Sequence, residues 1–333
     1  MRIEEIGLST WRENVPKSGF TPFHLPEALE VIDSHFDGEM RLYGGFKGQE
    51  LVSMLPLFVR ERVVGRAVFS PPPGLGVPRL GPVLMPTSPK RRKKEKVNRE
   101  FTEAVLSELD LDDRLTLFRM ICPPAYADPR PYRWSDLDVE TLFTYRLSVG
   151  SRSVDDVLST FSRSLRREMK KRDDLDVTVS EEGLDAARYV YDITANRYGE
   201  QEETLSADYR FVYDVGEALG DRFRVYVVRN ADGEFLSGLA VLFSNDAAYY
   251  WLGGAKTVHR NVSVNNFLHL RVIEDIAAGV PVESVDSYDL VGANTERLCS
   301  YKAKFGGDLV PYYAVETGGV GMDVAKAVYR YAR

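Results

Sequence analysis

The sequence of 333 residues is long enough for two domains, is 44% hydrophobic and contains only two cysteines, which excludes a disulfide framework. Its net charge of −7 argues against nucleic-acid binding through bulk charge, and none of its four histidines has metal-ligand spacing, which disfavours a zinc or iron site. No apolar run approaches the roughly 18 residues of a membrane-spanning helix, and residues 1–19 lack the apolar centre of a secretory signal, so we expect a cytoplasmic protein without a transmembrane segment.

The first half of the chain carries strand signals separated by turn residues. One segment pairs two apolar runs around Gly48, as a β-hairpin does, and the segment after it is rich in proline, which cannot donate to a sheet. Further on, Phe101, Val105 and Leu109 recur at helical spacing. The expected elements are, in order, a hairpin over 41–62, loops with short edge strands over 63–86, a helix over 89–110, and strands over 114–122 and 143–149.

The second half repeats an order of helices, antiparallel strands and a strand-helix-strand unit. We expect helices over 154–172, 184–199, 207–220, 265–279, 295–306 and 323–333. We expect strands over 176–181, 223–230, 234–245, 247–255, 287–292 and 308–316. This order is typical of a mixed α/β (α+β) fold, a mixed sheet flanked by helices, and not of a classical doubly wound sheet.

Several segments together resemble the Fem-type (FemAB-like) branch of the GNAT acyltransferase superfamily. They are "GQELVSMLPLFV" at 48–59, "FSRSLRREMKKRDDLDVTVS" at 161–180, "NNFLHLRVIEDIAAG" at 265–279 and "YDLVGANTERLCSYKAKFGGDLV" at 288–310. The resemblance implies two tandem GNAT-like domains, each a mixed, mostly antiparallel sheet flanked by helices, with the acceptor site in the cleft between them. We place these domains at 1–150 and 151–333, with the last helix free to pack back on the first domain.

Cations form a contiguous arc on the helix expected at 154–172. They are Arg163, Arg166, Arg167, Lys170 and Lys171. A solvated helix surface explains such an arc. Like charges repel one another, however, so the arc also suits a phosphate-bearing donor or acceptor, and the resemblance places a similar basic helix here. Arg163, Arg167 and Lys170 are therefore candidate substrate-binding residues, whereas we expect the other basic run, Pro89–Lys96, to be a solvated segment.

Lys302 and Lys304 close the helix expected at 295–306. Both would stabilise the negative end of that helix without any further function. Residues two apart on a helix point to different sides, so only one of the two can serve a given site. The resemblance aligns Tyr301 and Lys302 with an aromatic-lysine pair that is essential in Fem-type enzymes. We therefore predict that Lys302 points inward and stabilises developing negative charge, that Tyr301 lines the site, and that Lys304 is a surface residue.

Three further residues complete the predicted site. The resemblance aligns Arg197 with an arginine that binds acceptor phosphates, and Tyr250 with a tyrosine of the cleft. Asp289 ends the strand before "LVGAN", where a GNAT-like strand parts from its neighbour and admits the donor. Asp289 is either a general base that accepts a proton from the attacking amine, or a buried acid that caps a backbone amide.

Two departures from related sequences bear on the substrates. Acetyl-CoA-dependent GNAT proteins carry a glycine-rich loop whose amides cradle pyrophosphate. In "HRNVSVNN" (259–266), Arg260 fits that loop but Ser263 and Asn265 replace its glycines. This disfavours acetyl-CoA, as in Fem-type enzymes. Cys122 occupies the place of an aspartate that is frequent in those enzymes, and their acceptor-binding lysine has no match, which weakens the case for a muropeptide acceptor.

We therefore predict an amide-forming acyltransferase with no bound cofactor or metal. The favoured co-substrate is aminoacyl-tRNA, with acyl-CoA as the alternative, and the acceptor is an amine, in one version a phosphate-containing cell-envelope precursor. One rival is an acyl-CoA-dependent GNAT N-acyltransferase. Another is a non-catalytic protein that holds an anionic ligand in the cleft, and a third is nucleic-acid binding through the two basic segments. The sequence does not indicate the oligomeric state.

Overall fold

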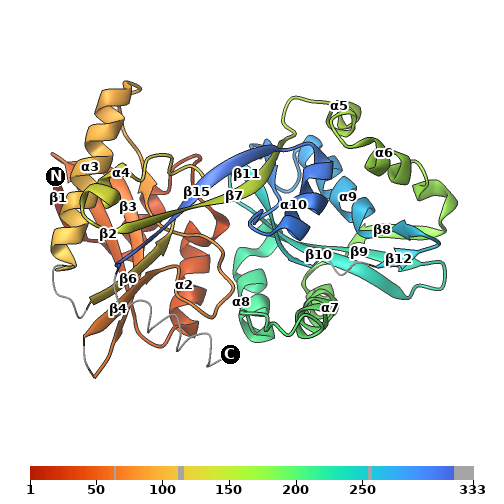
Figure 1. Ribbon diagram of the computed structural model, residues 1–333, viewed down its shortest axis with the longest axis horizontal. Coiled ribbons are helices and arrows are strands. Elements are labelled where there is room, and N and C mark those ends of the chain that lie inside the picture. The colour runs from red at the N-terminus through yellow and green to blue at the C-terminus, as the bar shows by residue number, and fades with distance from the viewer. Residues whose placement is uncertain (64, 112–115, 254–256, 319–333) are drawn as a thin grey trace. The chain divides into compact units, whose positions relative to one another are not determined.

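Two compact units divide the chain. The computed structural model describes residues 1–63, 65–111, 116–253 and 257–318 (Figure 1). Contacts group residues 1–142 with residues 311–318 in the first unit, and 143–310 in the second. The domain bounds 1–150 and 151–333 stay a prediction, and the helix expected over 323–333 lies outside the described residues.

The first unit contains a sheet with helices against it. Its elements are β1 (Arg2–Glu5), α1 (Leu8–Asn14), α2 (Pro26–His35), β2 (Glu39–Lys47), β3 (Glu50–Glu61), β4 (Arg66–Ser70), β5 (Val83–Leu84), α3 (Arg91–Glu108), β6 (Thr116–Ile121), α4 (Arg130–Trp134) and most of β15 (Asp308–Glu316). The strand order is β1-β2-β3-β4-β6-β15, and β5 pairs with β3. Only β4 and β6 run parallel among the strand pairs given for this unit.

The predicted hairpin and the long helix of the first unit are confirmed. β2 and β3 are joined at Gly48, whose φ of 67° suits glycine in a tight turn. Phe101 and Val105 of α3 are buried in the core with Phe118 of β6. The expectation of edge strands over 63–86 is wrong for β4, which lies between β3 and β6, because its apolar run ends before the prolines begin.

The second unit has the same kind of architecture. Its elements are β7 (Asp138–Ser148) from residue 143 on, α5 (Val154–Ser159), α6 (Arg163–Met169), β8 (Val177–Glu181), α7 (Ala187–Gly199), α8 (Tyr209–Leu219), β9 (Phe223–Asn230), β10 (Phe235–Phe243), β11 (Ala247–Gly253), β12 (Val258–His259), β13 (Val262–Ser263), α9 (Asn265–Ala277), β14 (Ser287–Asp289) and α10 (Glu296–Lys302). The main sheet has the order β7-β14-β11-β10-β9-β8, in which β11 and β14 are parallel and the other pairs antiparallel.

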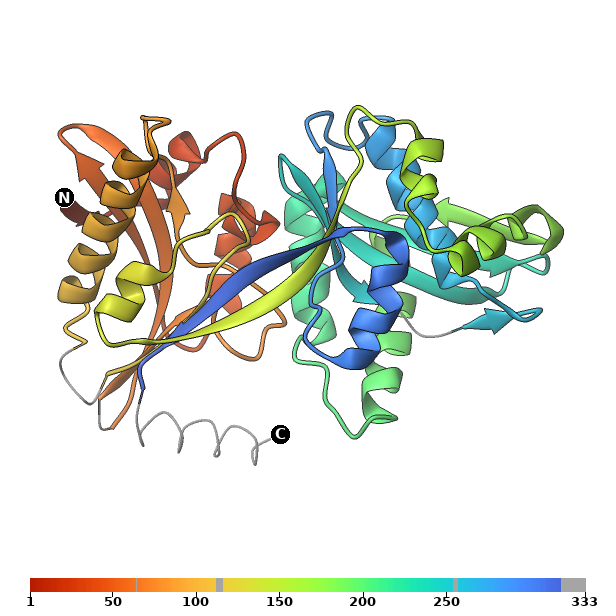
Figure 2. The same ribbon diagram turned by 45° about the horizontal axis from the view of Figure 1, so that its top comes forward.

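Helices cover both faces of this sheet. α7 packs on β10 and β11 and α8 packs on β9, whereas α9 crosses β8, β9 and β10 on the other face with α5 and α6 against it (Figures 1 and 2). The apolar side of the basic segment is buried, because Phe161, Leu165 and Met169 join the core. Each unit is thus a mostly antiparallel sheet with one parallel strand-helix-strand step, which confirms the mixed α/β fold class predicted from element order.

Candidate active site

Strands β11 and β14 stop pairing part of the way along β11. Their register runs from Ala247 opposite Ser287 to Tyr249 opposite Asp289. Beyond this point β11 continues along β10 to Gly253. The chain after Asp289 instead follows β7, because the Leu290 amide donates to the Tyr145 carbonyl. The two parallel strands therefore part at Tyr249 and Asp289, and the predicted site residues lie around this point.

Lys302 enters this region from the end of α10. Its side chain is only 5% exposed, and its Nζ donates to the backbone carbonyls of Val291 and, at 2.8 Å, of Gly292. The same ammonium lies 5.7 Å from the ring centroid of Tyr250 on β11, which is cation–π distance. Lys302 thus points inward, as predicted, and joins the two diverging strands, whereas Lys304 is exposed.

Asp289 shapes the loop that Lys302 contacts. It is 1% exposed, and its Oδ1 accepts from the Thr144 hydroxyl at 2.5 Å and from the Val291 amide at 2.8 Å. Val291 has a φ of 47°, a left-handed value that a β-branched residue rarely adopts. Asp289 and Lys302 therefore hold Val291 at both its N–H and its C=O, and the loop stays in a strained conformation that is typical of functional sites.

Aromatic rings surround His269 of α9 next to Lys302. The His269 ring lies 5.1 Å from Tyr250, 4.8 Å from Phe305 and 6.1 Å from Tyr301, and its Nδ1 is 2.9 Å from the Tyr288 hydroxyl. Burial, reinforced by the positive charge of Lys302, lowers the pKa of His269 from 6.5 to about 3. The imidazole is therefore neutral at neutral pH and adds no second positive charge beside the ammonium.

Tyr250, Tyr301 and Arg197 are electrostatically coupled. Burial raises the pKa of both tyrosines, and the Arg197 charge opposes that rise. The Tyr301 hydroxyl donates to Oδ1 of the buried Asn266 at 3.4 Å. Gln201 connects the end of α7, which carries Arg197, to Arg297 of α10. The structure thus brings Lys302, Asp289, Tyr250, Tyr301 and Arg197 into one region of the second unit.

Comparisons with known proteins agree with this geometry. Residues 159–303 match the family model of the acetyltransferase (GNAT) domain. The FemX crystal structure covers 94% of this chain and 97% of its own, with a TM-score of 0.66 and 12% identity. The C-terminal domain of a putative lysylphosphatidylglycerol synthetase from Agrobacterium fabrum matches with a TM-score of 0.56 and 12% identity, over 97% of this chain and 94% of that one. L-PGS from Bacillus licheniformis matches with a TM-score of 0.52 and 14% identity, over 98% of this chain and 97% of that one. No curated protein matches the sequence.

The fold of FemX agrees with the resemblance found in the sequence, and the GNAT model matches the second half of the chain. At these identities the solved structures establish the fold that this chain shares. Every predicted site residue lies inside the matched GNAT domain, from Arg163 to Lys302. The point at which β11 and β14 part therefore lies within the segment that the GNAT model matches.

The basic segment of the GNAT domain differs from the prediction. The single helix expected over 154–172 is wrong, because the chain breaks at 160–162 into α5 and α6. Ser162 begins α6, where its hydroxyl accepts from the Leu165 amide at 3.3 Å and its own amide donates to the Lys304 carbonyl. Arg163, Arg167 and Lys170 are exposed, and no ion pair of theirs occurs among the described residues.

The segment in the place of the CoA-binding glycine loop forms a hairpin. β12 and β13 pair through Val258 and Ser263, and both turn residues, Arg260 and Asn261, have positive φ. Arg260, which was predicted to fit the loop, forms an exposed ion pair with Asp176 at 3.3 Å. The helix that follows begins with the buried side chains of Asn265 and Asn266, so this hairpin differs in kind from a glycine cradle.

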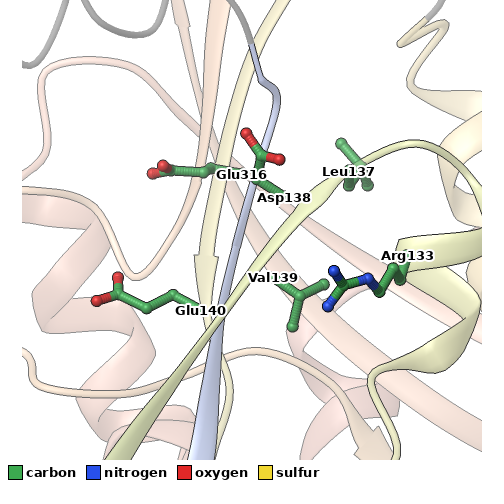
Figure 3. Close-up of a pocket in the computed structure, with 6 residues that line it drawn as sticks. All are labelled: Arg133, Leu137, Asp138, Val139, Glu140 and Glu316. Atoms are coloured by element: carbon green, nitrogen blue, oxygen red, sulfur yellow. The ribbon is translucent and has the colours of Figure 1, made fainter.

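The first unit contains a hollow of about 190 Å³. It is lined by Arg133, Leu137, Asp138, Val139, Glu140 and Glu316. In Figure 3 the carboxylates of Glu140 and Glu316 extend to the same side, and that of Asp138 extends to another. No group of three or more histidine, cysteine or acidic side chains that could hold a metal ion occurs in the described parts of the chain. The hollow contains none of the predicted site residues, and it is not the candidate site.

Sequence reasoning missed the partners contributed by α9 and β14. Asn266 and His269 lie one turn apart on the buried face of α9, and Tyr288 lies on β14 beside them. Two polar side chains at i and i+3 on an otherwise apolar helix face were the available signal, because buried polar groups need partners.

None of the helices in the described parts of the chain combines the length and apolar character needed to cross a membrane.

Proposed function

We propose that this chain is an amide-forming acyltransferase that moves an aminoacyl group from aminoacyl-tRNA to an amine. The observation that carries the proposal is the buried Lys302 ammonium at the point where β11 and β14 part. A buried positive charge is costly unless it stabilises something negative, and a reaction that gathers charge on an oxygen benefits from a charge already in place.

The reaction needs no covalent enzyme intermediate. The acceptor nitrogen attacks the ester carbonyl, the new C–N bond forms, and the carbonyl oxygen carries the negative charge of the tetrahedral intermediate. The C–O bond to the ribose then breaks, and the ribose hydroxyl leaves with the proton that the amine has lost. Lys302 stabilises the oxyanion electrostatically, and Asp289 is the proposed first acceptor of the amine proton.

Arg197 and the two tyrosines position the substrates in this proposal. Arg197 supplies positive potential for a phosphate, and Tyr250 and Tyr301 line the place where the carbonyl lies. Arg163, Arg167 and Lys170 offer exposed cations to a phosphate-bearing substrate. The proposed acceptor is an amine of a cell-envelope precursor, and the proposed location is the cytoplasm, where aminoacyl-tRNA is made.

Aminoacyl-tRNA is the favoured donor because the hairpin β12–β13 replaces the glycine loop. Side chains of Ser263 and Asn265 stand where glycines let the backbone approach pyrophosphate. Acyl-CoA is the second candidate donor, because the GNAT family model matches this domain. Isothermal titration with CoA thioesters separates the two donors, since only the second predicts saturable binding.

The test offers the purified full chain a set of charged tRNAs with a panel of primary amines, and measures amide formation. We expect Lys302→Ala to lower turnover about 100-fold or more, as the loss of one preorganised stabilising group does. Urea unfolding of the same variant separates loss of chemistry from loss of fold. Full turnover by Lys302→Ala would refute the assigned role. Ligand binding without turnover in any mixture would favour a non-catalytic binding protein. The hydrogen bonds of Lys302 and Asp289 to backbone groups support this second candidate.

A further inference from the structure

Glu168 is the one acid in the cationic helix α6. Its sequence neighbours Arg166, Arg167, Lys170 and Lys171 are exposed, but the Glu168 side chain is half-buried and makes no ion pair with them. Its Oε2 instead accepts from Nδ2 of Asn266 at 2.6 Å. The Glu168 carboxylate thus bonds a buried amide although cations lie next to it on the helix. Balancing the charge of those cations does not explain its position.

The Asn266 amide fixes how this carboxylate is presented. Asn266 is 3% exposed, donates through Nδ2 to Glu168, and accepts through Oδ1 from the Tyr301 hydroxyl. The amide can satisfy both bonds in only one orientation. It therefore connects α6 through α9 to α10, which carries Lys302, and in the described chain the second oxygen of Glu168, Oε1, makes no hydrogen bond.

The charge of Glu168 reaches the candidate active site. It raises the pKa of Tyr301, after burial and Tyr250, and the Asn266 amide joins the Glu168 carboxylate to the Tyr301 hydroxyl, so the carboxylate lies one side chain away from Tyr301. Lys302 lies at cation–π distance from Tyr250, and the positive charge of Arg197 acts on both Tyr250 and Tyr301. The site therefore presents one negative group and two positive groups around aromatic rings, an arrangement that suits a substrate carrying a cation close to a polarised carbonyl or phosphate.

We propose that Glu168, held by Asn266, binds the primary ammonium group of a substrate. This inference rests on the proposed function, because it names the residue that binds an ammonium group of one of the substrates of that reaction. The ammonium has two possible sources, the α-amino group of the aminoacyl donor and the amine of the acceptor, and both are the same chemical group. Glu168 breaks and forms no covalent bond in this role; it is a specificity-determining residue.

Binding tests the inference without turnover. The probes are L-alaninamide, which carries an ammonium group, and propionamide, which lacks it, titrated into the full chain and followed by NMR chemical shifts. We expect alaninamide to bind wild type about ten-fold more tightly than propionamide, the effect of one charge-assisted hydrogen bond, and Glu168→Gln to abolish the difference. Asp174→Asn, a matched control, removes an exposed acid just after α6 and should keep the difference.

The outcomes separate this inference from the proposed function. Equal binding of the two probes to wild type, or an unchanged preference in Glu168→Gln, overturns the ammonium site. Ammonium-selective binding in a protein that turns over no donor overturns the proposed function and leaves the ammonium site standing.

Kinetics then distinguishes the two sources of the ammonium. Wild type and Glu168→Gln are compared with aminoacyl-tRNA and with the matching α-hydroxyacyl-tRNA, which has no amino group. A loss of kcat/KM confined to the aminoacyl donor assigns the ammonium to the donor. A rise of the acceptor KM with both donors assigns it to the acceptor. Unchanged kinetics with both donors overturns the inference.

Discussion

At the scale of single residues, the candidate site depends on one strained residue. Val291 has a left-handed φ, and Asp289 bonds its amide while Lys302 bonds its carbonyl. Holding such a residue costs of order 1–3 kcal/mol, which these two bonds offset. Asp289 and Lys302 are consequently structural whatever else they do, and only variants that separate holding the loop from chemistry can assign a catalytic role.

Asp289 offers such a pair of variants. Asp289→Ala leaves the Thr144 hydroxyl and the Val291 amide without their acceptor, so we expect it to cost about 2–4 kcal/mol in the free energy of unfolding and most of the turnover. Asp289→Asn keeps an oxygen for both bonds but is a far weaker proton acceptor, so stability should return while turnover stays low. Turnover restored by asparagine would show that Asp289 only positions the loop.

His269 makes stability depend on pH. Its pKa is about 3 in the folded chain and 6.5 when unperturbed, so between these values the unfolded chain binds more protons and the free energy of unfolding rises with pH. Between pH 7 and pH 5 this residue alone should remove about 2 kcal/mol. We expect His269→Phe to reduce the change in the free energy of unfolding between pH 7 and pH 5, measured by urea denaturation, by that amount. Part of the pH dependence should remain in this variant, because burial lowers the pKa of His24 in the first unit to about 4. An unchanged profile would contradict the buried neutral imidazole.

At the scale of elements, periodicity predicted most helices and strands but not their internal breaks. The apolar side chains of Phe161, Leu165 and Met169 keep helical spacing across 160–169, so nothing in their pattern shows the break that Ser162 caps. β14 ends at Asp289, three residues before the predicted end, because the chain changes partner there, and a partner is a tertiary property. The inward direction of Lys302 could be predicted because the resemblance and its position on the helix agree. The hydrogen bonds of Asn266 to Glu168 and Tyr301 could not, because they depend on contacts between three helices.

The start of α6 provides a test of how the cationic segment is positioned. The Ser162 hydroxyl caps α6, next to the place where the backbone amide of Ser162 donates to the Lys304 carbonyl just beyond α10, whereas Ser153 caps α5 with Asp156 on the surface. Each serine-to-alanine variant should lose about 1 kcal/mol in the free energy of unfolding. Only Ser162→Ala should also raise the KM of a phosphate-bearing substrate, because α6 carries Arg163 and Arg167. Equal KM values for the two variants would remove the basic arc from the binding proposal.

Gly306, after α10, lies against the break between α5 and α6. Its φ is 68°, and a Cβ there would lie 2.3 Å from the Thr160 carbonyl oxygen. Gly48, in the turn between β2 and β3, has a nearly identical φ of 67°, with open space around its Cβ position. Gly48→Ala should cost only the positive-φ backbone penalty of about 1–2 kcal/mol, and Gly306→Ala clearly more, because backbone must shift. Equal unfolding free energies for these variants would show that the two segments do not pack this tightly.

At the scale of the whole chain, both units contain one parallel strand pair, but only the second leaves it open. In the first unit β4 pairs with β6 as far as Ser70 opposite Met120. The chain then returns, with the Leu80 amide donating to the Ile121 carbonyl and the Gly81 amide donating to the Ser70 hydroxyl. The position beside β6 that corresponds to the parting of β11 and β14 is thus filled by the chain's own backbone.

One site per chain is the consequence, and Cys122 provides the means to check it. Cys122 follows β6, is fully buried, and keeps its proton because burial raises the pKa of its thiol. We expect a non-hydrolysable aminoacyl-adenosine amide to bind with a stoichiometry of one per chain, measured by calorimetry. Cys122→Ala should bind it with unchanged affinity, at the cost of some stability from the lost packing. Two equivalents bound, or binding lost with Cys122→Ala, would place a working site in the first unit and contradict the argument from its filled strand edge.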